Sequence, residues 1–277
     1  MDLISYGDGI PEGEYRLHSA FANALNFCRG RIVVSLVPPR AGAGPMNLVV
    51  SQLPAGARRL RASRFYFYVD ENRLRKVPAA LYSSSIPELR PEPAAVLANA
   101  RRLGRLLAEL APEKSLAFIF DPRLERDFSR TFERRLLARF KKAVAAFRSG
   151  DYRGGARAMR GLGFGLTPSG DDFISGMLAG LNYAALNLGV DASVRVELLY
   201  FSAVGRNLIS NSFLEASYEG RVNAKTLRLL KALSAAGGRG LRGALSAALD
   251  SGHTSGADFC AGLAFALLEA LSWKEKL

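Results

Sequence analysis

The residues best suited to chemistry lie in a glycine-rich motif that occurs twice in the second half of the chain. Residues 161–173 read GLGFGLTPSGDDF, and residues 252–259 read GHTSGADF. If Pro168 is treated as an insertion, the two copies share the pattern Thr-(Pro)-Ser-Gly-x-Asp-Phe-x-x-Gly. The aligned pairs are Thr167 and Thr254, Ser169 and Ser255, Gly170 and Gly256, Asp172 and Asp258, Phe173 and Phe259, and Gly176 and Gly262. Each copy leads into an apolar segment, which predicts two related helix beginnings.

A helix beginning of this composition is suited to binding a small anion. The N-terminus of a helix carries roughly half a positive charge and several free N–H donors. Glycines ahead of the first helix leave further backbone N–H groups open. We therefore expect phosphate or a carboxylate to bind here. The candidate binding residues are Gly163, Gly165, Thr167, Ser169, Gly170, Thr254, Ser255 and Gly256.

Three carboxylates and one imidazole are the candidates for proton transfer. Asp171 and Asp172 are adjacent, so on a helix they point about 100° apart. Asp172 is expected to cap or orient, and Asp171 to act as a general base or to contact a metal. Asp258 is the counterpart of Asp172, and His253 could act as a general acid or base. We predict no cofactor and no metal site, because no His/Asp/Glu cluster has the spacing of metal ligands.

A polar patch is expected on a helix predicted over residues 193–218. Asn207, Ser210 and Asn211 are spaced i, i+3 and i+4, so they would share one face of that helix. A solvent-facing patch is the simplest interpretation. If the face meets the two motifs, its amides could bind a planar carbamoyl or oxamate group.

The repeat also has an interpretation without chemistry. Ser169 with Asp172, and Ser255 with Asp258, fit a capping box, which contributes about 1 kcal/mol. Small residues four apart would allow two helices to pack closely about a local two-fold axis. Capping and packing do not account for the extra glycines before the first helix or for Asp171.

The surrounding sequence predicts an α+β protein. Short β-branched runs at 31–37, 47–53 and 64–69 favour a small antiparallel β barrel or sandwich, with a helix over 19–28 leading into it. Prolines within 86–93 mark a boundary, so we predict a β-rich domain at 1–92 and a mainly helical domain at 93–277. Further helices are expected at 94–110, 123–148, 151–160, 170–188, 222–235, 239–249 and 255–273, and residues 115–120 could form an isolated strand or a buried connection.

Composition and the distribution of charge indicate which partners and locations to expect. The 277 residues are 49% hydrophobic and carry a net charge of +13. Because the basic residues are spread along the chain and no basic run is interleaved with aromatics, we do not expect nucleic acid as a partner. By sequence alone, no apolar run is long enough to span a membrane, and the N-terminus lacks the features of a signal peptide, so cytoplasmic location is the default expectation. Assembly into a homo-oligomer is compatible with this composition.

Residues 161–176 and 252–262 together resemble a family of oxamate carbamoyltransferase subunits. The resemblance implies carbamoyl transfer in the breakdown of small anionic ureides, in which oxalurate and phosphate are interconverted with oxamate and carbamoyl phosphate. It also implies that other carbamoyltransferase subunits are required. The alternative is a non-catalytic structural or regulatory subunit of a metabolic enzyme complex, in which the repeat serves helix packing.

Overall fold

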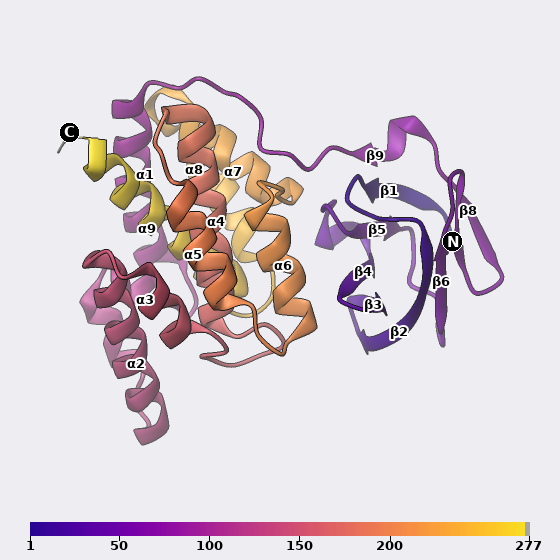
Figure 1. Cartoon of the computed structure of the whole chain (residues 1–277), viewed down its shortest axis with the longest axis horizontal. Coiled ribbons are helices and arrows are strands. Elements are labelled where there is room, and N and C mark those ends of the chain that lie inside the picture. Colours follow the sequence, from indigo (N-terminus) through magenta and orange to yellow (C-terminus); the bar gives the residue numbers. More distant parts are fainter. Residues whose placement is uncertain (275–277) are drawn as a thin grey trace. The chain divides into compact units, whose positions relative to one another are not determined.

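A computed structural model describes residues 1–274 and divides the chain into two compact units. The first contains Met1–Ser85 together with Arg221–Ala224, and the second contains Ile86–Gly220 and the chain from Lys225 onward. The first unit is a sheet and the second is helical (Figure 1). The predicted α+β class is confirmed, whereas the boundary placed at residue 92 stays a prediction.

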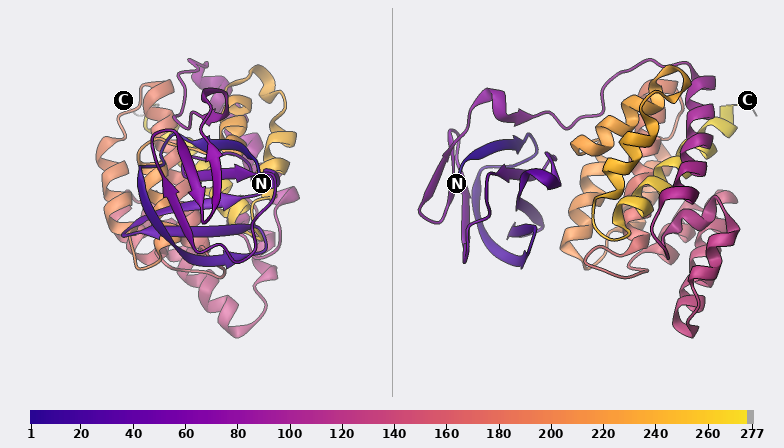
Figure 2. Two further views of the ribbon diagram at one scale, coloured as in Figure 1. Left: turned by 90° about the vertical axis from the view of Figure 1, so that its right-hand side faces the viewer. Right: turned by 180° about the vertical axis from the view of Figure 1, so that it is seen from behind.

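The first unit is a nine-stranded sheet that curls into a half-barrel (Figure 2). The strand order is β8-β7-β6-β2-β3-β4-β5-β1-β9. Most neighbours are antiparallel, as expected, but β4 pairs with β5 and β1 with β9 in parallel, so the sheet is mixed. The strands are β1 (Leu3–Gly7), β2 (Gly13–Phe21), β3 (Ala24–Arg29), β4 (Ile32–Val37), β5 (Asn47–Val50), β6 (Arg59–Ala62), β7 (Tyr66–Val69), β8 (Asn72–Arg75) and β9 (Leu81–Tyr82).

Alternation of side chains explains why these segments form strands. In β6 and β7 every second residue is buried, so one face of the sheet packs into a core and the other remains accessible. Phe27, Leu36, Leu60 and Phe67 are fully buried in that core. The helix predicted over 19–28 is wrong. Those residues form the β2–β3 hairpin, because β3 pairs with β2 on one side and β4 on the other.

The second unit consists of helices joined by short connections. They are α1 (Pro93–Leu110), α2 (Thr131–Arg148), α3 (Tyr152–Met159), α4 (Ser169–Leu188), α5 (Ser193–Ala203), α6 (Leu208–Tyr218), α7 (Ala224–Ser234), α8 (Leu241–Leu249) and α9 (Ser255–Lys274), with 3-10 turns η3 (Leu116–Ile119), η4 (Pro122–Asp127) and η5 (Ala236–Gly238).

Two helical predictions need correction. The helix expected over 193–218 is two helices. The Asn207 side chain accepts hydrogen bonds from Ile209 N and Ser210 N and so caps the N-terminus of a separate helix, α6. The helix expected over 123–148 begins only at Thr131, after the 3-10 turn η4 and the non-helical Phe128. Of the two alternatives stated for residues 115–120, the buried connection is confirmed, since these residues form the buried 3-10 turn η3.

Helices α4 and α9 form the most extensive contact between any two elements of this unit. They cross at two glycines that the motif alignment pairs. A Cβ on Gly176 would overlap the carbonyl oxygen of Phe259, and a Cβ on Gly262 would overlap that of Phe173. Because Phe173 and Phe259 are also aligned, the contact is the same when the two helices exchange places. The predicted local two-fold packing is therefore present.

Helix α9 is long and apolar enough, by length and composition, to cross a membrane over Ser255–Ser272. The expectation that no apolar run has this length is therefore wrong. However, 72% of that window is buried inside the structure, which is what a core helix shows.

The helix crossing predicts opposite effects for alanine at different glycines. Gly176→Ala and Gly262→Ala should each lower the free energy of unfolding by about 1–3 kcal/mol, because a methyl group there meets backbone rather than a flexible side chain. Gly243→Ala in α8, where the nearest atom is 3.8 Å away on Arg228, should raise it by up to about 1 kcal/mol. Urea unfolding of the three variants would measure this. Equal stability of all three would contradict the close crossing.

Candidate functional site

The two copies of the motif meet where α4 and α9 begin. Thr167 Oγ1 lies 3.1 Å from Ser255 Oγ and donates a hydrogen bond of 2.9 Å to Asp172 Oδ2. Thr167 and Ser255 are 88 positions apart in the sequence, so the two helix beginnings form one site.

The turn that precedes each helix is repeated as well. Gly170 lies against the carbonyl of Met159 at the end of α3, and Gly256 lies against that of Ala248 near the end of α8. At both positions a Cβ would overlap a backbone oxygen, so glycine is required for the close approach. Each half of the site therefore consists of a short helix, a connecting loop and a longer helix.

Asp258 is the most deeply buried carboxyl group of the site, with no exposed surface. Its Oδ1 accepts a hydrogen bond of 2.7 Å from the backbone N–H of Leu116, and its Oδ2 has no hydrogen-bond partner in the described part of the chain. Burial raises the pKa of Asp258 to about 7, although the Leu116 N–H and the side chains of Ser169 and Thr254 act in the opposite direction.

Asp172 lies close enough to Asp258 for their charges to interact. Burial is the main cause that raises the pKa of Asp172 well above its ordinary value, and the charge of Asp258 raises it further. Hydrogen bonding from Ser255 and Thr167 lowers that pKa in part. Two carboxyl groups in such a position cannot both ionise at low cost, so the pair retains a proton near neutral pH.

The contacts of the two aspartates are exchanged between the motif copies. Asp172 interacts with Thr167 of its own copy and Ser255 of the other, while Asp258 interacts with Thr254 of its own copy and Ser169 of the other. The polar groups therefore follow the same two-fold symmetry as the helices α4 and α9. We call Asp172 and Asp258 the aspartate pair.

Asp171 points away from the aspartate pair, as the helical geometry predicts. Its Oδ1 accepts a hydrogen bond of 2.7 Å from Gly161 N, which fixes the start of the glycine-rich loop. Burial raises the pKa of Asp171, while Gly161, Ser210 and Arg160 lower it. The general-base role expected for Asp171 stays a prediction.

The glycine-rich loop presents backbone donors. Gly161, Gly163 and Gly165 all have positive φ, which side chains disfavour. Within residues 1–274, the N–H groups of residues 163–167 donate no hydrogen bond, and neither do those of residues 252–255 in the second copy. The site therefore combines free donors in its loops with the aspartate pair beneath them.

Asn207 and Asn211, two of the predicted binding residues, hydrogen-bond to the backbone of loops and do not line a shared binding site. Asn207 Nδ2 donates a hydrogen bond of 2.7 Å to Leu166 O, so the start of α6 holds the glycine-rich loop. Asn211 uses both ends of its amide on the backbone of Gly205, at 2.9 Å each. Ser210 is buried beside Asp171. His253 is exposed on the turn between α8 and α9.

The capping box expected at the first copy does not form. Pro168 occupies the N-cap position of α4 and makes no side-chain cap, and Ser169 is the first helical residue. Ser255 is likewise the first residue of its helix, so neither serine is an N-cap. Instead, Ser169 interacts with Asp258, and Ser255 interacts with Asp172.

Sequence reasoning missed the contribution of η3. The Leu116 N–H is the donor that holds Asp258 in place, yet a backbone group leaves no signature in the sequence. The apolar character of residues 115–120 shows only that the segment is buried.

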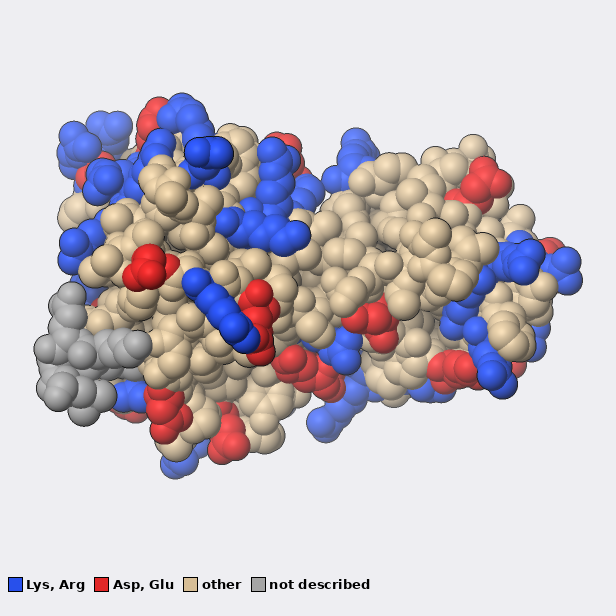
Figure 3. Space-filling model, turned by 90° about the horizontal axis from the view of Figure 1, so that it is seen from above, with Lys and Arg blue, Asp and Glu red and all other residues tan. Residues whose placement is uncertain are grey.

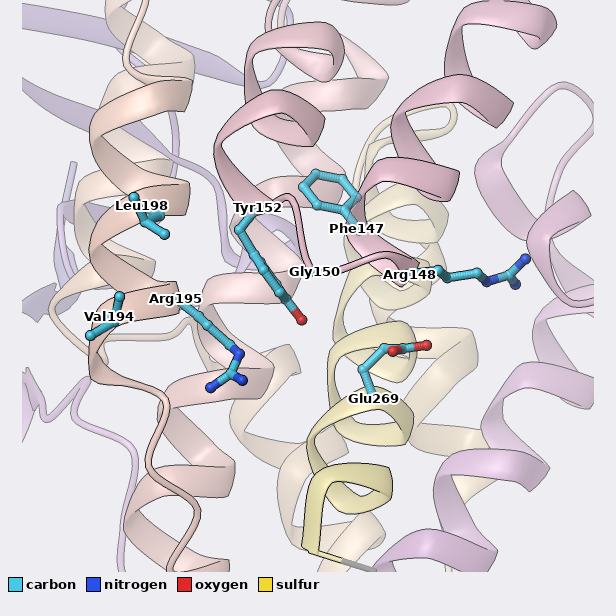
Figure 4. Close-up of a pocket in the computed structure, with 8 residues that line it drawn as sticks. All are labelled: Phe147, Arg148, Gly150, Tyr152, Val194, Arg195, Leu198 and Glu269. Atoms are coloured by element: carbon cyan, nitrogen blue, oxygen red, sulfur yellow. The ribbon is translucent and has the colours of Figure 1, made fainter. Parts of the chain in front are cut away.

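A cavity of about 320 Å³ lies elsewhere in the helical unit (Figure 4). Its lining comes from the α2–α3 turn, α5 and α9 and includes Tyr152, Arg195 and Glu269, but none of the predicted site residues. Glu269 is eleven positions beyond Asp258, about three turns along α9. Within the described chain, no group of three or more His, Cys, Asp and Glu residues is placed to bind a metal ion.

The raised pKa values predict how stability depends on pH. The folded protein binds a proton at Asp258 more tightly than the unfolded chain does, whose Asp pKa is near 3.8. The free energy of unfolding should therefore fall as the pH rises from about 4 to about 7, by up to about 1.4 kcal/mol per pH unit from this group. Asp258→Asn should flatten the decline, whereas Asp250→Asn, at an exposed site, should not. Parallel profiles for all three proteins would refute the buried proton.

Comparison with known proteins finds a family that the region of the site resembles. Residues 159–267 match the family model of oxamate carbamoyltransferase subunit AllH. Neither the curated proteins nor the solved structures include a match to the chain. The matched segment runs from the end of α3 into α9 and contains both copies of the motif and the aspartate pair. Over this segment the chain is similar to the AllH family of oxamate carbamoyltransferase subunits.

Proposed function

We propose that this protein is the subunit of a carbamoyltransferase that binds a small anionic ureide and phosphate, with the meeting point of the two motif copies as its active site. The observation that carries the proposal is the contact between Thr167 and Ser255, which brings both donor-bearing loops over the aspartate pair. The proposed reaction converts oxalurate and phosphate into oxamate and carbamoyl phosphate.

Anion binding is proposed for the loops and not for the carboxylates. The unpartnered N–H groups of residues 163–167 and 252–255 lie at the starts of two helices, where the helix dipoles favour negative charge. Ionised aspartates beneath them would repel an anion. A proton held by the aspartate pair reduces that repulsion, which is consistent with the raised pKa values of both groups.

The proposed chemistry needs one proton to move from phosphate to nitrogen. An oxygen of hydrogen phosphate attacks the carbamoyl carbon of oxalurate, and the bond from that carbon to the bridging nitrogen breaks. Carbamoyl phosphate forms, and the nitrogen leaves as the amide of oxamate after it gains the proton that phosphate loses. Backbone N–H groups would stabilise the charge on the tetrahedral intermediate.

The aspartate pair is suited to carry that proton. A carboxyl group that holds a proton near pH 7 can donate it to the leaving nitrogen, and its ionised neighbour can accept the proton from phosphate. Asp172 is the member of the pair next to Thr167 and Ser255. We therefore assign the role of proton donor to Asp172 and the role of proton acceptor to Asp258.

Other subunits would complete the complex. Phe164 and Leu166 at the tip of the glycine-rich loop are about half exposed, and Phe132 packs edge-on against Phe164 with ring centroids 5.7 Å apart. Exposed apolar side chains beside a site are typical of a surface that a partner covers. We propose that a partner subunit closes over this loop tip.

A structural subunit without catalysis is the second candidate. It is favoured by the burial of all three aspartates and by the use of Asp171 to anchor Gly161. In that case the motif serves to pack α4 against α9, and the chemistry belongs to a partner subunit.

Substitution within the pair separates the two candidates. In the assembled complex, Asp172→Asn should lower kcat for carbamoyl phosphate formation by about 10²–10⁴-fold, because the amide cannot donate an acidic proton. Asp250→Asn, the same change at an exposed position, should leave kcat unchanged. Unaltered kcat in Asp172→Asn would assign the protein to the structural candidate.

Ligand affinity tests the loops independently of catalysis. Thr167→Val and Ser255→Ala should each weaken the binding of phosphate and oxamate to the complex by about tenfold or more, since each removes a hydroxyl at the meeting point. Ser246→Ala in α8, whose hydroxyl donates to the carbonyl of Arg242, is the matched control. Calorimetry would measure the affinities, and unchanged values in the first two variants would remove the ligand from this site.

A further inference from the structure

One accessible face of the N-terminal sheet carries arginines and tyrosines in alternation. The strands β6, β7 and β8 lie side by side at one edge of the sheet, and their outward residues face the same side. We call this surface the arginine–tyrosine face; it consists of Arg59, Arg61, Tyr66, Tyr68, Arg73 and Arg75.

Strand pairing produces the alternation. Arg61 lies opposite Tyr68, which in turn lies opposite Arg73 on the next strand. Tyr66 lies opposite Arg75. Basic and aromatic side chains therefore alternate across the strands.

The side chains of this face are stacked. The Arg61 guanidinium lies 4.0 Å from the centre of the Tyr68 ring, and that of Arg73 lies 4.9 Å from the centre of the Tyr66 ring. The two tyrosine rings are 6.0 Å apart. Stacking restricts the guanidinium groups, so less conformational freedom is lost when a ligand binds them.

Few acidic side chains lie near this face; one is Asp70 in the β7–β8 turn, whose carboxylate accepts hydrogen bonds from the backbone N–H groups of Arg58 and Arg59. Within residues 1–274, none of its four arginines forms an ion pair, whereas Arg242 and Arg123 of the helical unit are paired with Glu109 and Asp121. The strands β2, β6, β7 and β8 contain one acidic residue, Glu14, opposite Arg61. At the right of Figure 3, Lys and Arg side chains gather at this end of the unit, with Asp and Glu side chains beside them.

Protection of a sheet edge explains part of this surface. β8 is an edge strand, and charges on an edge strand prevent pairing with another sheet. That argument covers Arg73 and Arg75. It does not cover Arg61 and Tyr68, which lie on strands paired on both sides.

We propose that the arginine–tyrosine face binds single-stranded nucleic acid. Unpaired arginines supply contacts for phosphates, and planar rings and guanidinium groups supply surfaces on which bases stack. An acidic protein surface would use the charges but has no need of the rings. From the sequence we did not expect nucleic acid as a partner, because no basic run is interleaved with aromatic residues. In the folded sheet, arginines and tyrosines alternate from one strand to the next and not along any single strand.

Fluorescence anisotropy with fluorescein-labelled twelve-nucleotide oligo(U) and oligo(dT) tests the proposal on the full chain. Arg61→Ser/Arg73→Ser should weaken binding about tenfold or more at about 0.1 M salt, and should lower the slope of log affinity against log salt by about 2. Arg134→Ser/Arg135→Ser, which removes two exposed charges from α2, should change neither quantity by more than about twofold. Equal losses in both variants would show a general charge effect and overturn the proposal.

The rings are tested separately. Tyr66→Leu/Tyr68→Leu keeps every charge and should still weaken binding about tenfold, because base stacking is lost. Arg59→Ser/Arg75→Ser provides a second arginine variant should the first fail to fold, as judged by its melting curve. Unchanged affinity in the tyrosine variant, or displacement of the oligonucleotide by poly-glutamate at equal charge, would point to an acidic protein and refute nucleic acid as the ligand.

Discussion

The crossing of α4 and α9 at Gly176 and Gly262 is the constraint on which the site depends. Close contact of the two backbones places both helix beginnings side by side, and the same operation that exchanges the helices exchanges Asp172 with Asp258. A larger residue at either crossing point would separate the helices. The hydroxyl contact between Thr167 and Ser255 would then be lost together with the coupling of the carboxyl groups.

This packing creates an electrostatic cost that the local structure offsets only in part. Two helix N-termini stabilise negative charge, and the Leu116 N–H adds a direct donor to Asp258. Burial opposes both effects and prevails, since the pKa of Asp258 is raised to about 7 by its removal from water. The least costly state therefore keeps a proton between the carboxyl groups, so the fold that packs the helices also stores a proton.

The sequence predicted the parts of this arrangement that depend on local pattern. Apolar periodicity and the motif located α4 and α9, and the aligned glycines predicted a two-fold crossing. The capping boxes were wrong because Ser169 and Ser255 are each the first residue inside their helix and interact with the aspartate of the other copy. The role of the Leu116 N–H depends on Asp258, which is distant in sequence, so no local pattern reveals it. The helix predicted over 19–28 was wrong because β3 pairs with a strand on each side, which a single segment does not show. The arginine–tyrosine face was missed because its alternation arises between paired strands and not along any one of them.

The differences between the two halves carry as much information as their symmetry. The first half has Asp171 to anchor Gly161 and a longer loop held by Asn207, whereas the second has Ala257 and the exposed His253. A symmetric frame would bind a ligand equally well in either of two orientations. The proposed substrate carries a carboxylate at one end and a carbamoyl group at the other, so only unequal loops can distinguish its ends. The frame is therefore suited to holding the proton, and the unequal loops to orienting the substrate.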